Sequence, residues 1–128
     1  MQLNRKGIYQ EFDATGAVCT DERWQAITLP DGSIHVENET VRIKPSPEPR
    51  SDSATCILDR DLRLLDFSIH GLFGKRESRV CVLGEARQEA TLCWRHEGAV
   101  HERKVAWNDA LEIDYNSPLF NMITIWRC

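Results

Sequence analysis

The stretch Cys93-Trp94-Arg95-His96, followed by His101, holds a dense set of side chains that could do chemistry. A thiol and two imidazoles are ligands that zinc prefers, and this spacing would offer three of them across one hairpin. Zinc sites usually combine tightly spaced ligand pairs with a fourth ligand, and no fourth ligand is recognisable in this sequence. We therefore predict no metal site and two histidines near a solvated turn.

A nucleophilic enzyme needs a Ser or Cys beside a base that a third group orients. Ser117 precedes Pro118 and is typical of a helix N-cap, while Cys56, Cys81 and Cys93 lie in apolar strand patterns. Asp59 and Asp61 flank an arginine, where turn chemistry explains them at least as well as acid–base catalysis. We assign no catalytic residue and expect no cofactor.

Aromatic residues are the remaining candidates for a functional site. Aromatic side chains with a polar group suit the lining of an apolar ligand cavity, although a packed core explains them equally well. Arg63, Arg95 and Arg103 lie in predicted strands and could meet an anionic head group if they face inward. We predict a ligand-binding set with Arg95 as the head-group contact, lined by Trp24, Phe67, Trp94, Trp107 and Tyr115.

Alternation of apolar and polar residues predicts roughly nine short strands, at spacings typical of an antiparallel barrel or sandwich. A change of parity between Val36 and Val41 predicts a bulge near Asn38-Glu39, and a second change after Leu64 predicts a sharply bent strand. Three prolines predict a loop over residues 44–53. The predicted strands are Gly7–Phe12, Trp24–Leu29, Ile34–Ile43, Thr55–Leu58, Leu62–Leu72, Arg79–Leu83, Gln88–Arg95, Val100–Trp107 and Leu111–Tyr115.

Helical spacing appears near the C-terminus, where Leu119, Met122, Ile123 and Trp126 stand at i, i+3, i+4 and i+7. Ser117 as N-cap and Pro118 in the first turn support one helix there. A single helix in a strand-rich chain is expected to cover a sheet as a lid.

The chain of 128 residues is expected to form a single domain, residues 1–128. Its net charge of −4, with Lys and Arg scattered, argues against nucleic acid as a partner. The N-terminus lacks the apolar stretch of a secretion signal and no window reaches the length of a membrane span, so a cytoplasmic location is expected. The five cysteines are widely spaced and are predicted to be reduced.

Several phrases resemble the glycolipid-binding protein family of bacteria, whose fold is like that of the lipoprotein carriers LolA and LppX. They are Glu22-Arg23-Trp24, Pro30-Asp31-Gly32, Glu37-Asn38-Glu39-Thr40-Val41, Leu58-Asp59-Arg60-Asp61-Leu62 and, above all, Ile113-Asp114-Tyr115-Asn116-Ser117-Pro118-Leu119-Phe120-Asn121. The resemblance implies an antiparallel half-barrel whose concave face wraps a hydrophobic space covered by helix. It carries over no catalytic residue.

We therefore expect a mainly β, antiparallel half-barrel, lipocalin-like or LolA/LppX-like, with one C-terminal helix as lid. The expected function is non-enzymatic binding of a lipidic or amphipathic small molecule between the curved sheet and that helix. One alternative is an enzyme, or a chromophore- or haem-handling protein, that uses a Cys or His at the cavity mouth. Another is a dimeric structural module, a homodimer joined through an open sheet edge or the C-terminal helix.

Overall fold

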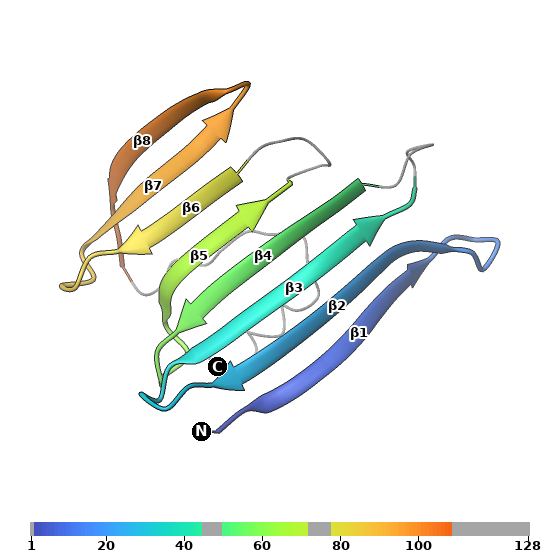
Figure 1. Ribbon diagram of the computed structural model, residues 1–128, viewed down its shortest axis with the longest axis horizontal. Helices are drawn as coiled ribbons and strands as arrows, with labels where there is room; N and C mark the ends of the chain where they lie inside the picture. Colours follow the sequence, from blue (N-terminus) through green and yellow to red (C-terminus); the bar gives the residue numbers. More distant parts are fainter. Residues whose placement is uncertain (1, 45–49, 72–77, 109–128) are drawn as a thin grey trace.

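The computed structural model describes residues 2–44, 50–71 and 78–108. These residues form one eight-stranded sheet in which every strand pairs antiparallel with its neighbours in sequence, in the order β1 to β8 (Figure 1). The strands are β1 (Asn4–Phe12), β2 (Val18–Thr28), β3 (Ile34–Arg42), β4 (Arg50–Leu58), β5 (Leu64–His70), β6 (Ser78–Leu83), β7 (Glu89–His96) and β8 (Ala99–Ala106). The prediction of a mainly β, antiparallel fold is confirmed.

The sheet is a meander that does not close within the described residues, because β1 pairs with β2 alone and β8 with β7 alone. These two strands therefore form opposite edges of the sheet (Figure 1). The predicted strand over Leu111–Tyr115 and the predicted helix from Ser117 to Trp126 lie outside the described residues. In the part of the chain that is described, no helix is long and apolar enough to span a membrane.

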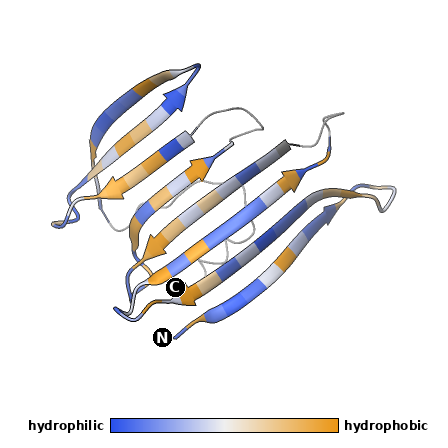
Figure 2. Ribbon diagram, viewed as in Figure 1, coloured by the Kyte–Doolittle hydropathy of each residue, from blue (hydrophilic) through white to orange (hydrophobic). Residues whose placement is uncertain are grey.

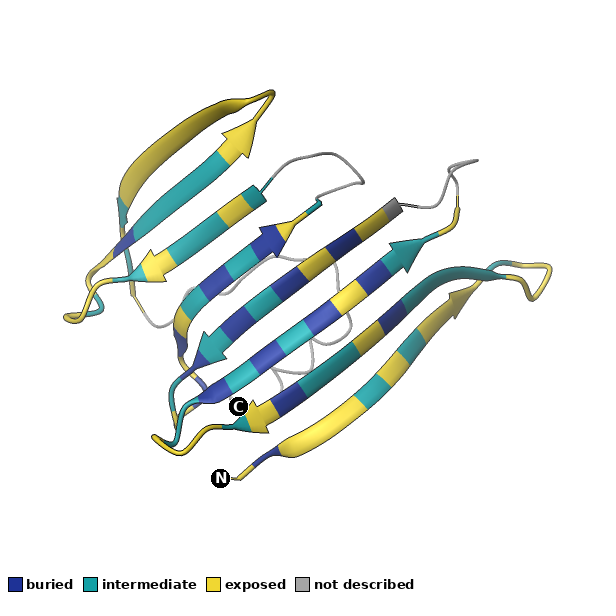
Figure 3. Cartoon of the chain, viewed as in Figure 1, coloured by how far each residue is buried: buried dark blue, intermediate teal, exposed yellow. Residues whose placement is uncertain are grey.

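Residues that pair across strands share a face, so the register divides the sheet into two faces. One face, here called the core face, carries nearly all the buried side chains; the opposite, polar face carries charged, hydroxyl and amide groups. Figures 2 and 3 show the resulting alternation along β3, β4 and β5. The most deeply buried apolar residues of the core face are Ala26, Ile34, Val36, Ala54, Cys56, Leu58, Ile69 and Ala90, at 0–3 % exposure.

The bulge predicted near Asn38-Glu39 is wrong. The register runs without a break from Thr28 opposite Ile34 to Thr20 opposite Arg42. Asn38 and Thr40 continue the core face at 4 % and 1 % exposure, so the apolar pattern changed parity only because polar residues are buried there. The register instead shifts between Glu11 and Phe12 and between Ile57 and Leu58.

The second of these shifts lies opposite the start of β5, where Leu58 pairs with Leu64 and Ile57 pairs with Asp66. Leu65 is therefore the extra residue, and it is exposed. This agrees with the parity change predicted after Leu64. Leu62 was predicted to lie in this strand, but it lies in the turn before β5 and has a positive φ of 62°.

The loop predicted over residues 44–53 is wrong at its end, because β4 begins at Arg50 and its residues pair with β3 through Asp52 opposite Thr40. The polar sequence Ser51-Asp52-Ser53 is not loop-like in this sheet, since Asp52 is 4 % exposed and lies 3.7 Å from Nε of Arg42. Residues 45–49, with the three prolines, lie outside the described part.

Strand β6 lies inside the sheet between β5 and β7. The turns that connect the strands repeat one geometry: the amide of Asp13 donates to the carbonyl of Ala17, and that of Asp59 to the carbonyl of Arg63, both at 2.9 Å. The Asp side chains also accept backbone N–H groups inside their turns. Asp and Gly in these stretches therefore fix the hairpin lengths and the register that follows.

Candidate ligand-binding surface

The predicted ligand-binding residues do not all share one face. Trp94 lies on the core face, opposite Arg79 on β6 and His101 on β8, whereas its neighbour Arg95 pairs with Ser78 and Val100 on the polar face. Arg95 therefore points away from the aromatic residues that it was predicted to accompany. Successive residues of a strand point to opposite faces, so the local phrase Trp94-Arg95 could not place both in one pocket.

Trp24 and Phe67 do lie on the core face, where both pack in or against the hydrophobic interior. Phe67 is 8 % exposed and lies in the hydrophobic cluster, and Trp24 packs against that cluster half-buried. The Trp24 ring stacks on Tyr9, with centroids 6.1 Å apart, and lies over Gly7, where an added Cβ would come within 2.7 Å of the ring. Gly7 thus leaves the space that Trp24 occupies.

Trp107 follows β8 and also packs against the core cluster. Its amide donates to the carbonyl of Gln88 at 2.8 Å, which places it beside the start of β7. Its indole Nε1 is buried and finds no hydrogen-bond acceptor among the residues that the structure describes. Buried donors usually have an acceptor, so this N–H could donate a hydrogen bond to an acceptor atom of a ligand. Tyr115, the last predicted site residue, lies outside the described residues.

A network of polar side chains is buried in the core face between β2, β3 and β4. Nδ2 of Asn38 donates to Oε2 of Glu22 at 3.0 Å, and the Thr40 hydroxyl donates to the same oxygen at 3.2 Å. Oδ1 of Asn38 accepts the amide of Ala54 at 3.1 Å. Glu22 is 1 % exposed, and buried carboxylates persist only when they are hydrogen-bonded or paired. The network therefore holds three strands in one register.

The core face changes character from β6 onward. Cys81, Leu92 and Trp94 are half-buried there, while Arg79, His101 and Arg103 are exposed (Figure 3). The register forms two ladders across these strands: Phe67, Cys81, Leu92, Arg103 and Ile69, Arg79, Trp94, His101. The Trp94 and His101 rings are stacked, with centroids 5.3 Å apart and planes at 19°. Apolar and cationic groups thus lie side by side on an accessible surface.

We call this surface the amphipathic surface, formed by Cys81, Leu92, Trp94, Arg79, His101 and Arg103. Arg103 was among the arginines considered from the sequence, and Arg79 was missed. Arg63, the third arginine considered, lies in the turn before β5 and is exposed. The parity of Arg79 with Cys81 and Leu83, all core-face residues of β6, is the sequence feature that places it.

Cys81 is the one cysteine of the amphipathic surface. Burial, followed by the nearby Asp66 carboxylate, raises the pKa of its thiol above the ordinary value. A raised pKa lowers the fraction of thiolate, so Cys81 is poorly suited to act as a nucleophile. Cys93 and His101 lie on opposite faces, so they do not form the metal site considered from the sequence. Among the described residues, no group of three or more His, Cys, Asp or Glu side chains is arranged to hold a metal ion.

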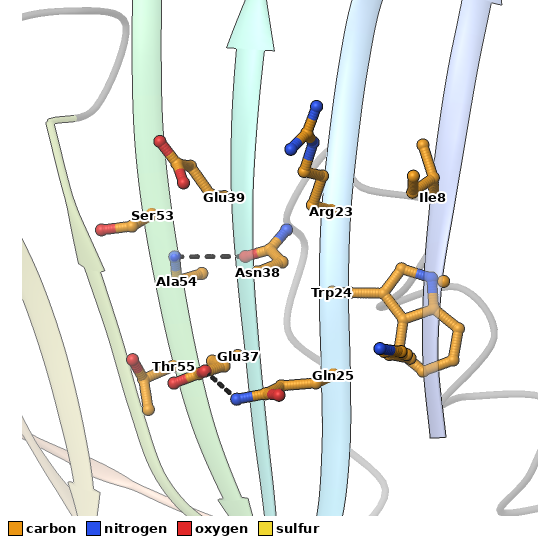
Figure 4. Close-up of a pocket in the computed structure, with 12 residues that line it drawn as sticks. Ile8, Arg23, Trp24, Gln25, Glu37, Asn38, Glu39, Ser53, Ala54 and Thr55 are labelled. Carbon is orange, nitrogen blue, oxygen red and sulfur yellow. Dashed lines mark hydrogen bonds between the residues drawn. The ribbon is translucent and has the colours of Figure 1, made fainter.

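A second hollow lies across the first four strands, an open groove of about 840 Å³ (Figure 4). Its walls come mainly from the polar face, where Nε2 of Gln25 donates to Glu37 and Arg23 pairs in register with Glu39. The lining carries two basic and two acidic side chains, Lys6, Arg23, Glu37 and Glu39, so the groove is a solvated surface without a net attraction for one class of ligand. Of the predicted ligand-binding residues in the described part, Trp24 alone lines it.

No family model, curated protein or solved structure matches the chain. The resemblance to the glycolipid-binding family stays a prediction.

Proposed function

We propose that the protein is a non-enzymatic binding protein for an amphipathic molecule that carries an acidic group, and that the amphipathic surface on β6–β8 contacts this molecule. In its fuller form the proposal includes the half-barrel and the helix predicted from Ser117 to Trp126, with the ligand held between helix and sheet. The observation that carries it is the pair of ladders that set Trp94 and Leu92 beside Arg79 and Arg103 on one accessible face.

The apolar part of such a ligand would lie on Leu92, Cys81 and the Trp94 ring. These side chains are half-buried, so a ligand that covers them removes apolar area from water at about 25 cal/mol per Å². The ladder continues inward to Phe67, which is buried. The apolar part of the amphipathic surface is therefore continuous with the hydrophobic core.

The acidic group would meet Arg79 and Arg103, which flank the aromatic pair on neighbouring ladders. Guanidinium groups bind carboxylate, sulfate or phosphate through two parallel hydrogen bonds, and such charge-assisted bonds are among the stronger ones in proteins. This assignment replaces Arg95, which lies on the polar face. The buried N–H of Trp107 could donate a hydrogen bond to a further polar atom of the ligand.

The proposal predicts that the purified protein binds 1-anilinonaphthalene-8-sulfonate, an amphipathic anion whose fluorescence rises in an apolar site. We expect Arg79→Gln and Arg103→Gln each to weaken this binding about tenfold, and Trp94→Leu to weaken it similarly. The matched control is Arg95→Gln, which removes the same charge from the neighbouring position on the opposite face and should leave the affinity unchanged. Equal affinities for the Arg95 and Arg103 variants would contradict the proposal.

Mass spectrometry of an organic extract of the purified protein would identify a natural ligand. A carrier of the proposed kind should yield an amphipathic acid in near-stoichiometric amount from the wild-type protein and much less from Arg103→Gln. An extract without such a molecule, together with no binding of the probe, would favour the alternatives of an enzyme or a structural module. Modification of a thiol by iodoacetamide at neutral pH, faster than that of free cysteine, would point to the enzyme.

A further inference from the structure

The two edges of the sheet differ in what they can pair with. Just before β1, the carbonyl of Leu3 accepts a hydrogen bond from the amide of Thr28 in β2 at 2.8 Å, so the backbone of Leu3 bonds toward β2. Bonding direction alternates along an antiparallel strand, and the N–H and C=O groups of Lys6, Ile8 and Gln10 therefore point away from β2. Within the described residues nothing pairs with this side of β1. It is an open hydrogen-bonding edge.

The sequence of β1 is complementary to itself when two copies run antiparallel. Ile8 is the midpoint of Asn4–Phe12, and a two-fold axis through it sets Ile8 opposite the partner's Ile8. The same register sets Arg5 opposite the partner's Glu11 and Lys6 opposite the partner's Gln10. Both partners in each pair belong to the same face, as an antiparallel sheet requires. Opposite charges then meet twice and like charges never meet directly.

The side chains at this edge are placed for such a contact. Ile8 is 62 % exposed, on the polar face at the centre of the strand, where an isolated large apolar residue gains by being covered. Arg5 and Glu11 are both exposed and accessible.

The other edge does not have this property. The amide of Trp107 donates to Gln88, so Val100, Glu102 and Lys104 direct their backbone groups outward from β8. One register that keeps β8 nearly fully self-paired sets Glu102 opposite the partner's Glu102. The other sets Glu102 opposite the partner's Lys104, but it also sets Arg103 opposite the partner's Arg103. Like charges directly opposite destabilise a strand pair. Charged residues on β8 therefore disfavour pairing of that edge with a second copy, as they do at many sheet edges.

From this contrast we propose that the protein forms a homodimer by antiparallel pairing of β1 with β1 of a second copy, with the two-fold axis at Ile8. The pairing joins two eight-stranded sheets into one continuous sheet. It adds about six backbone hydrogen bonds, from the reciprocal pairs of Ile8 with the partner's Ile8 and of Lys6 with the partner's Gln10. The proposal is independent of the amphipathic surface, which lies at the far side of the sheet.

A charge exchange tests both the edge and the register. Sedimentation equilibrium of the full chain should show a dimer whose dissociation constant rises about tenfold in Arg5→Glu and about tenfold in Glu11→Arg, because each creates like-charge pairs. The double variant Arg5→Glu/Glu11→Arg restores the opposite charges and should return the constant to near the wild-type value. The same exchange on β8, Glu102→Lys/Lys104→Glu, serves as the matched control and should have no effect.

Hydrogen exchange locates the contact independently of any substitution. The amides of Lys6, Ile8 and Gln10 should become more protected as protein concentration rises, while those of Val100, Glu102 and Lys104 should not. If the wild-type protein stays monomeric at 100 times the protein concentration used for hydrogen exchange, the proposal is overturned. Concentration-dependent protection of the β8 amides without protection of β1 would overturn it as well.

Discussion

The core face has two halves that follow the same alternation but differ in burial. Between β2 and β5 its buried apolar residues are 0–8 % exposed, with Trp24 packed half-buried against them, and a hydrogen-bonded polar network lies among them. Between β6 and β8 it is half-covered and carries Arg79 and Arg103. A period of two therefore identifies which residues share a face, but it does not tell whether that face is covered. The burial and charge of individual residues decide that.

The largest expected effect comes from removing apolar volume on the covered half. Ile34 is 0 % exposed, so Ile34→Ala should lower the free energy of unfolding by about 3 kcal/mol, because the lost contacts and the cavity both cost. Leu92→Ala on the half-covered part should cost about 1 kcal/mol. Urea unfolding followed by tryptophan fluorescence measures both. Equal losses would show that the two halves are equally covered.

A somewhat smaller loss is expected from Asn38→Ala. It removes one of the hydrogen bonds that the buried Glu22 carboxylate accepts and the side-chain acceptor of the Ala54 amide, at a cost of about 2–3 kcal/mol. Glu39→Gln, at the next position but on the polar face, should change stability by less than about 0.5 kcal/mol. The urea midpoints of the two variants should therefore separate clearly; if they coincide, the network contributes only solvated hydrogen bonds.

Substitutions at two residues with positive φ, one in each half, are expected to change the stability of the fold in opposite directions. Leu62, with φ 62°, is 4 % exposed, so Leu62→Gly relieves backbone strain but loses more in burial, with a net loss of about 1 kcal/mol. Glu97, with φ 48°, is exposed in the turn between β7 and β8, so Glu97→Asn should stabilise by about 0.5 kcal/mol. Thermal unfolding of both variants measures these shifts, and a gain in both would mean that Leu62 contributes little by burial.

The smallest effect concerns acid. The Asp13 carboxylate binds Lys44, beyond the end of β3, and accepts hydrogen bonds from Thr15, and these contacts hold the pKa of Asp13 well below its ordinary value. A pKa lowered in the folded state stabilises above the unfolded value and loses this contribution as pH falls below it. Asp13→Asn should therefore be less stable than wild type at pH 7, and the difference should shrink toward pH 2. A constant difference across this range would contradict the pairing, and Glu97→Gln is the control.

The sequence predicted the strands and their turns well, because alternation and Asp-Gly turns act locally. Prediction was weakest where polar residues are buried. Asn38, Thr40 and Asp52 follow the core face in register but break the apolar pattern, which led to a bulge and a loop that the sheet does not contain. Their burial depends on hydrogen bonds between three strands, and no single strand carries that information.

The candidate site could be predicted only in part, for the same reason. Trp94 lies on the core face, whereas its sequence neighbour Arg95 lies on the polar face, and the cationic neighbours of Trp94 are Arg79 and Arg103 on the flanking strands. Such neighbours across strands follow from the register of two hairpins. The residues near Trp94 in space are therefore separated from it in sequence, and the local sequence Trp94-Arg95 does not identify the arginines that share its face.

The meander has a consequence for how the chain acquires its structure. Each described strand pairs only with the strand before and the strand after it, so every pairing closes a short stretch of chain and costs little loop entropy. Sheets whose contacts are local in sequence form faster than those built from distant strands. During synthesis from the N-terminus, β1 and β2 can pair before β3 has been made, and each later strand can add to a template that is already present. Assembly by stepwise addition from β1 would leave β8 as the last edge to form.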